Sequence, residues 1–265
     1  MFHDIIIPLD GSKLAESAIG TGGWIATECR ARIHLVRAHV PQDGRFGTDD
    51  SVARAGVARY LHEMATWLTE GGVREVSVAV LEGSPALAIA DYADRVDADL
   101  IVMTTHGRTG GERRRLGSVA SVVAHHASCP VILARGEPEE SLSHRTPLKR
   151  VVLAVDGTER LAELHSLALR LGSLGHASFR IVYTGAPDLV PELVHAGAEE
   201  EGQRADERQA MASAESYVSG IATRLRAAGL RAEVLLVTTN EPMRAVLDAA
   251  ERDDAGVLVL LGQRH

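Results

Sequence analysis

The chain contains two copies of one pattern, and this repetition limits its possible folds more than any other feature. Residues 5–12 (IIIPLDGS) match residues 151–158 (VVLAVDGT) at an offset of 146, and residues 33–41 match 179–187 at the same offset. Farther along, residues 76–85 match 233–242 at an offset of 157. With 265 residues, the chain is long enough for two domains that each bury a core. We therefore predict two tandem domains.

Within each copy, short apolar runs alternate with helical patterns. A proline opens a helix in both copies, at Pro85 and at Pro242, where its missing N–H costs nothing. The alternation predicts an α/β protein whose sheets are parallel and covered by helices on both faces. In each copy, the helix before the third predicted strand has one apolar face. This face consists of Leu61, Met64, Ala65 and Leu68 in the first copy and of Met211, Ala214, Val218, Ile221 and Leu225 in the second.

The two copies differ at their ends. We predict a first domain over residues 1–136, a polar linker over 137–147 and a second domain over 148–265. Residues 257–260 correspond to the fourth strand, at 100–103, but no glycine-rich loop follows them. We therefore expect the second domain to lack the last helix and the fifth strand.

A glycine-rich loop follows the strand predicted at 100–103. Gly107 and Gly110 allow the backbone to approach a ligand closely, and Ser118 is expected to cap a helix that begins at Val119. The unpaired amides and the positive dipole end of such a helix favour a phosphate. The alternative, that the loop is only a tight connection, stays open.

Asp10 ends the first predicted strand. Open α/β sheets bind ligands at this end of their strands, and a carboxylate there can accept hydrogen bonds from ribose hydroxyls or an adenine amine. Asp10 can alternatively be the N-cap of the following helix.

On these residues the chain resembles a tandem universal stress protein over essentially its full length. The family's nucleotide-binding motif is a glycine, two residues, a second glycine, nine residues, and then glycine followed by Ser or Thr. Gly107, the nine residues 108–116 and Gly117-Ser118 match it, whereas Thr104 replaces the first glycine. The resemblance implies Rossmann-like domains of the adenine nucleotide α-hydrolase type, with parallel sheets of strand order 3-2-1-4-5.

The resemblance also implies roles for individual residues. Asp10 would contact the nucleoside, the backbone of Val40 would meet the adenine edge, and Met103 with Thr104 would line the sugar and the first phosphate. His106 and Arg108 would add charge at the γ-phosphate, unless they are only exposed loop residues. The complete implied nucleotide-binding set is Pro8, Asp10, Val40, Met103, Thr104, His106, Gly107, Arg108, Gly110, Gly117, Ser118 and Val119.

The expected function is that of a non-catalytic stress-response protein that binds ATP, or AMP or ADP, with or without Mg²⁺. The sequence has no Gly-x-x-x-x-Gly-Lys-Ser/Thr loop of the kind that phosphoryl-transfer enzymes use. Two alternatives stay open: a slow ATPase, and an interaction module that binds no nucleotide. We expect no metal site, because His125 and His126 are adjacent on a helix and point about 100° apart.

Composition limits the partners and the compartment. The net charge of −8 argues against nucleic-acid binding, and no apolar run approaches the roughly 20 residues that a membrane helix needs. Cys29 and Cys129 are expected to be reduced thiols, and residues 1–5 do not resemble a secretory signal, so we expect a cytoplasmic protein. Family members commonly pair through the fifth strand, which predicts a homodimer formed through residues 131–133.

Overall fold

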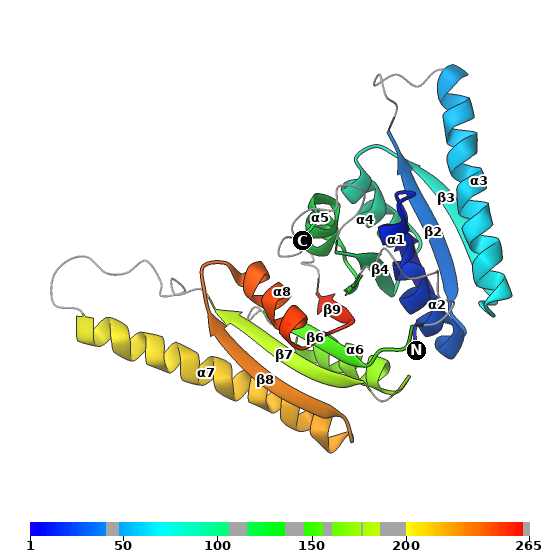
Figure 1. Cartoon of the computed structure of the whole chain (residues 1–265). Helices are drawn as coiled ribbons and strands as arrows, with labels where there is room; N and C mark the ends of the chain where they lie inside the picture. The colour runs from blue at the N-terminus through cyan, green and yellow to red at the C-terminus, as the bar shows by residue number, and fades with distance from the viewer. Residues whose placement is uncertain are drawn as a thin grey trace. The chain divides into compact units, whose positions relative to one another are not determined.

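The computed structural model (Figure 1) describes residues 1–40, 48–105, 116–135, 146–155, 161–175, 177–185 and 200–261. The chain forms two compact units. The first consists of Met1–Leu148 together with Gly256–His265, and the second consists of Lys149–Ala255. The C-terminal strand therefore belongs to the first unit, whereas the sequence repeat predicted it in the second domain.

The first unit contains the predicted doubly wound sheet. Its strand order is β3-β2-β1-β4-β5-β9, so the predicted order 3-2-1-4-5 is confirmed. All neighbours from β3 to β5 are parallel. The strands are β1 (Asp4–Pro8), β2 (Arg32–His39), β3 (Glu75–Glu82), β4 (Leu100–Thr104), β5 (Val131–Ala134) and β9 (Val257–Leu260).

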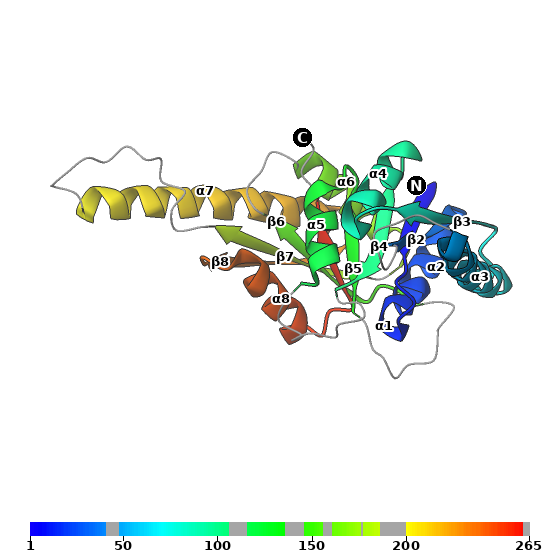
Figure 2. The same cartoon turned by 90° about the horizontal axis from the view of Figure 1, so that it is seen from above.

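Helices cover both faces of this sheet, which explains why the central strands are apolar throughout. Every residue of β4 and β5 is buried. Figures 1 and 2 show the helices that precede β3 on one face and those that follow it on the other. The former are α1 (Lys13–Glu16), α2 (Ala18–Cys29) and α3 (Thr48–Glu70), and the latter are α4 (Pro85–Arg95) and α5 (Ser118–His126).

The helix α2 packs very closely on β1. A Cβ on Gly22 would lie 2.4 Å from Cδ1 of Ile7, so any larger residue there would force the Ile7 side chain to shift.

The second unit repeats the first part of this architecture. Its three strands are parallel in the order β6-β7-β8, and its alternation of strands and helices follows that from β1 to α4, with α6 in the place of α1 and α2. The predicted face formed by Val218, Ile221 and Leu225 is buried. The elements are β6 (Arg150–Val155), α6 (Leu161–Gly172), β7 (Ser178–Gly185), α7 (Glu200–Ala227), β8 (Arg231–Thr238) and α8 (Pro242–Arg252).

The two copies agree even in an unusual backbone conformation. Pro85 opens α4 and Pro242 opens α8, as predicted. Beyond these helices, Asp97 and Asp254 both have positive φ angles, of 51° and 48°. Left-handed backbone is uncommon outside glycine, so its presence at equivalent positions supports the internal match at the offset of 157.

Strand β5 has no free edge. It pairs with β4 on one side and, in antiparallel fashion, with β9 on the other, where Val131 faces Leu260 and Ala134 faces Val257. The predicted route to a homodimer, through an open edge at residues 131–133, is therefore wrong. The exposed N–H and C=O groups of an edge strand favour pairing with another strand, and here β9 of the same chain pairs with β5.

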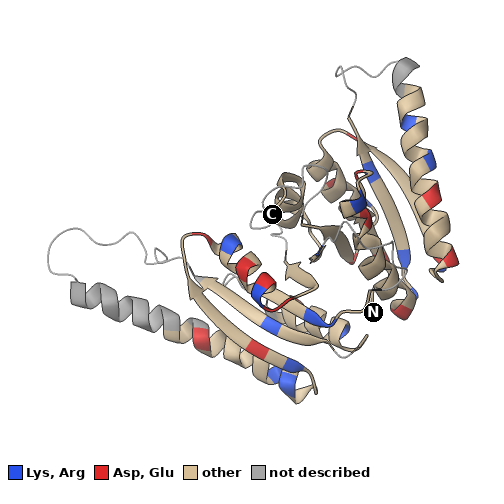
Figure 3. Cartoon of the chain, viewed as in Figure 1, with Lys and Arg blue, Asp and Glu red and all other residues tan. Residues whose placement is uncertain are grey.

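Charged residues of both signs are mixed along several of the helices. Figure 3 shows this on α8, which carries Arg244, Asp248 and Glu251. No helix in the described part of the chain is both long enough and apolar enough to cross a membrane.

Candidate functional site

The candidate site lies at the carboxyl ends of β1 and β4. These strands are parallel neighbours, with Ile5 opposite Leu100 and Ile6 opposite Ile101. The chain leaves β1 towards β2 but leaves β4 towards β5, so the connections diverge in opposite directions. Open α/β sheets bind ligands at such a reversal of strand order.

Asp10 lies in a short turn at the end of β1. Its Oδ1 accepts hydrogen bonds from the backbone N–H of Ser12 at 2.9 Å and from the Ser12 hydroxyl at 2.6 Å. Ser12 is the N-cap of α1, because its Oγ accepts a hydrogen bond from the Ala15 amide at 3.1 Å. The alternative reading of Asp10 as the N-cap is therefore wrong, and Asp10 instead orients the residue that caps the helix.

A backbone hydrogen bond closes the base of the loop after β4. The Gly117 amide donates to the Thr105 carbonyl over 2.7 Å. The loop therefore leaves β4 and returns to the start of α5 at nearly the same place. This contact positions the N-terminus of α5 at the carboxyl end of β4.

The helix α5 begins one residue earlier than predicted. It starts at Ser118, and its N-cap is Gly117, which has no side chain and makes no side-chain capping bond. The prediction that Ser118 caps a helix beginning at Val119 is wrong, because Ser118 already has helical backbone geometry. The first amides of α5 therefore donate no hydrogen bond to an N-cap side chain, which favours an external acceptor.

The structure brings five more of the predicted residues to this end of the sheet. Pro8 ends β1, and Met103 and Thr104 end β4, all three buried. Val119 is half-buried in the first turn of α5, and Val40 follows β2 with 57% of its surface exposed. His106, Gly107, Arg108 and Gly110 lie outside the described residues, as does Asp156, the counterpart of Asp10 in the second copy.

Thr104 occupies the position of the motif's first glycine without backbone strain. It is a regular residue of β4 opposite Ala134, and its φ is not among the positive values. A side chain is therefore compatible with the backbone at this position.

Arg37 of β2 also reaches this region, which the sequence did not predict. The Leu9 amide donates to the Val36 carbonyl at 2.8 Å, so β1 runs beside β2 up to the turn that contains Asp10. Gly11 in that turn has a φ of +85°, and a Cβ on it would lie 2.6 Å from Nη1 of Arg37. The absence of a side chain at Gly11 thus makes room for the guanidinium group.

A second set of polar side chains supports Arg37. Its guanidinium carbon lies 5.4 Å from the ring centroid of Tyr60, a cation–π contact. The Tyr60 hydroxyl donates to Oε1 of the buried Glu16 at 3.0 Å, and Lys13 pairs with Oε2 of Glu16 at 2.7 Å. Burial, and then the negative charge of Glu16, raise the pKa of Tyr60 above its ordinary range.

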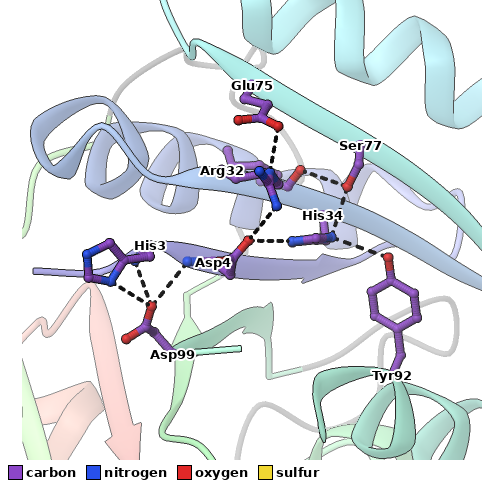
Figure 4. A network of polar contacts seen from close by, with 9 residues as sticks. His3, Asp4, Arg32, His34, Glu75, Ser77, Tyr92 and Asp99 are labelled. Carbon is purple, nitrogen blue, oxygen red and sulfur yellow. Dashed lines mark hydrogen bonds and ion pairs between the residues drawn. The ribbon is translucent and has the colours of Figure 1, made fainter. Parts of the chain in front are cut away.

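A separate polar network lies at the opposite, amino end of the sheet (Figure 4). Buried His34 contacts Oδ1 of Asp4 through Nε2 at 2.9 Å, and its Nδ1 lies 2.9 Å from Oγ of Ser77 and 3.2 Å from the Tyr92 hydroxyl. Arg32 pairs with the carboxylates of Glu75 and Asp4, and these contacts, chiefly the one with Glu75, raise the pKa of Arg32. The network ties β1, β2, β3 and α4 together away from the candidate site.

Metal ligands do not gather anywhere in the described ranges. Among those residues, no group of three or more His, Cys, Asp or Glu side chains is placed to hold a metal ion. The two cysteines, Cys29 and Cys129, are both buried and unbridged.

Comparison with known proteins decides the family. The profile of the universal stress protein family matches residues 1–135. The chain belongs to the universal stress protein family.

A curated relative matches about half of the chain, and two solved structures match nearly all of it. A universal stress protein of Methanocaldococcus jannaschii is 32% identical over 147 residues, which cover 53% of this chain and 86% of the relative. The structure of a universal stress protein from Archaeoglobus fulgidus DSM 4304 has a TM-score of 0.59 at 15% identity and covers 95% of this chain and 82% of its own. A putative universal stress protein from Pseudomonas aeruginosa UCBPP-PA14 has a TM-score of 0.56 at 17% identity, with 96% and 80% coverage. At these identities the two structures support the fold alone.

In this universal stress protein, sequence reasoning missed the side chains around Arg37. One signal pointed to them: Gly11 follows Asp10 directly, and a glycine in such a turn often marks a close approach by another group. Which residue approaches Gly11 depends on the pairing of β1 with β2, and this pairing cannot be seen in the sequence.

Proposed function

We propose that this universal stress protein binds an adenine nucleotide in its first unit. The observation that carries the proposal is the meeting of two features at one edge of the sheet. Asp10 ends β1, and the N-terminus of α5, without a capping side chain, is held at the end of the neighbouring β4 by the bond from Gly117 to Thr105. A carboxylate beside a set of amide donors suits a ligand that has a sugar next to phosphates.

Each predicted residue has a role in this proposal. The amides of Gly117, Ser118 and Val119 and the Ser118 hydroxyl donate to the phosphates. Asp10 accepts from the ribose, and Met103 and Thr104 border the sugar and the first phosphate. The proposal also includes Pro8, the backbone of Val40 at the adenine edge, and the loop residues His106, Gly107, Arg108 and Gly110.

The protein acts, in this proposal, as a regulatory component without catalytic turnover. No lysine of a Walker-type loop is present in the sequence to neutralise charge during phosphoryl transfer. Any Mg²⁺ would arrive with the nucleotide phosphates, since Mg²⁺ is commonly bound through substrate phosphates rather than a protein cage. The second unit binds no nucleotide.

The test is the nucleotide content of freshly purified protein. Denaturing the full chain and separating the supernatant by anion exchange should release ATP, ADP or AMP. Millimolar ATP should also raise the unfolding temperature, because a ligand that binds only the folded state stabilises it. A clean supernatant without a thermal shift would instead support an interaction module, and turnover well above about a few per minute would indicate an enzyme.

A further inference from the structure

Arg37 is half-buried, and among the residues that the structure describes it makes no ion pair and donates no hydrogen bond. Its guanidinium lies over the Tyr60 ring and close to the space that a Cβ on Gly11 would fill. A guanidinium carries five N–H donors in a planar fork, so this group can offer several donors to an anionic ligand.

Glu16 and Asp10, whose charges act on the Tyr60 ring that Arg37 contacts, have other donors. Oε1 of Glu16 accepts a hydrogen bond from the Tyr60 hydroxyl, and Oε2 of Glu16 pairs with Lys13. The Oδ1 of Asp10 receives two hydrogen bonds from Ser12. Tyr60 does not supply a negative charge, because burial and Glu16 keep its phenol protonated at neutral pH.

The order of the strands places Arg37 on the far side of Asp10 from the phosphate-binding amides. Along the carboxyl edge of the sheet, β4 leads to the N-terminus of α5, β1 leads to Asp10, and β2 carries Arg37. Adjacent strands are about 4.8 Å apart, so the axes of β2 and β4 are about 10 Å apart. This separation suits a ligand with an anionic group on each side of its sugar.

We infer that Arg37 forms a second anion subsite, which selects adenine nucleotides that carry an additional phosphate on the ribose. The inference rests on the proposed function, since the same ligand must place its 5′-phosphate at α5. Arginine suits this task because its planar fork binds a phosphate with two parallel hydrogen bonds. The carboxylate of Asp10 repels a nearby phosphate, and the bidentate pair with Arg37 offsets that repulsion.

The test compares two ligands by calorimetric titration of the full chain. Adenosine 3′,5′-bisphosphate should bind about tenfold more tightly than AMP, the gain expected from one charge-assisted pair. Adenosine 2′,5′-bisphosphate, titrated in parallel, shows whether the subsite accepts the neighbouring ribose position. Equal affinity for AMP and for both bisphosphates would overturn the inference while leaving the proposed function intact. Absence of binding by AMP, ATP and both bisphosphates would overturn both.

Variants connect the preference to Arg37. In Arg37→Leu, the Kd for AMP divided by the Kd for the bisphosphate should fall to about one, because the guanidinium is removed. In Arg37→Lys the ratio should be intermediate, because lysine keeps the charge but not the planar fork. Arg74→Leu, at an exposed site before β3, is the control and should keep the wild-type ratio. Far-ultraviolet circular dichroism should show each variant folded. A folded Arg37→Leu protein that keeps the full preference would contradict the assignment.

Discussion

The backbone amide of Gly117 donates a 2.7 Å hydrogen bond to the carbonyl oxygen of Thr105. This single bond joins the end of β4 to the start of α5 and fixes where the first amides of the helix lie. Because Gly117 is the N-cap and has no side chain, those amides have no N-cap side chain to which they can donate. The proposed phosphate site depends on this combination.

Replacing Gly117 by Asp should fill the phosphate site with the protein's own carboxylate. An aspartate N-cap accepts from the helix amides and interacts favourably with the helix dipole, so unfolding free energy should stay equal or rise by about 0.5 kcal/mol. ATP affinity should fall by about tenfold or more, because the same amides are occupied and the new charge repels phosphate. Gly117→Asn is the matched control and should lose less affinity, since it caps without the charge. Unchanged ATP affinity in Gly117→Asp would contradict the proposed site.

Replacing Asp10 by Asn should weaken nucleotide binding with little effect on folding. Asparagine keeps an oxygen that can accept from Ser12, so the turn before α1 should survive. A neutral acceptor binds a ribose hydroxyl less strongly than a carboxylate, and we expect about a tenfold loss of ATP affinity by calorimetry. Asp91→Asn, at an exposed site on α4, should bind like the wild type. Equal affinities in both variants would exclude a role for the Asp10 charge.

Tyr60 should make the protein less stable at high pH. Its pKa is raised in the folded state above the ordinary value near 10, first by burial and then by Glu16. As the pH rises through 10, the unfolded chain loses the phenolic proton while the folded protein keeps it, so the free energy of unfolding falls. Below pH 10 both states hold the proton, and this contribution is constant. Denaturant unfolding at pH 9, 10 and 11 should show a shallower fall for Tyr60→Phe than for the wild type, and identical slopes would refute the assignment.

Replacing His34 by Leu should destabilise the first unit. The leucine fills a similar space but leaves the hydroxyl of Tyr92 and one contact of Asp4 without the imidazole (Figure 4). The expected loss is about 2 kcal/mol of unfolding free energy, measured by chemical denaturation. Ser77→Ala removes two neutral contacts, with His34 and with the Ile33 carbonyl at the long distance of 3.4 Å, and should cost about 1 kcal/mol or less. A larger loss in Ser77→Ala than in His34→Leu would show that the imidazole is not the centre of this network.

Pairing between β5 and β9 should protect β5 within a single chain. The amides of residues 131–134 should exchange slowly with solvent hydrogen at every protein concentration, because Ile132 and Leu133 pair with Val259 and Leu258. Protection that appears only at high concentration would instead indicate pairing of β5 between two copies.

Much of the first unit was predictable because its signals are local. Uninterrupted apolar runs identified β4 and β5 as buried central strands, and Pro85 marked the start of α4. The strand order 3-2-1-4-5 was implied by the family resemblance, and Asp10 and the glycine-rich loop indicated the candidate site at the carboxyl ends of β1 and β4. The start of α5 was misplaced by one residue because both Gly117 and Ser118 are acceptable N-caps.

The remaining features depend on contacts between distant residues. The repeat at the offset of 157 assigns residues 257–260 to the second copy, and nothing in those four apolar residues shows that they pair with β5. Arg37 reads in the sequence as an ordinary strand residue, and its approach to Gly11 follows only from the pairing of β1 with β2. The partners of His34 come from β1, β3 and α4, at separations of 30 to 58 residues.

The central claim is that the first amides of α5 bind the phosphates of an adenine nucleotide. Titrating the isotopically labelled full chain with ATP and following its backbone amide resonances tests this claim directly. The amide resonances of Ser118 and Val119 should show among the largest saturable shifts, while the amide resonances of α8 should stay unchanged. Unshifted Ser118 and Val119 amides at saturating ATP, or shifts confined to the second unit, would contradict it.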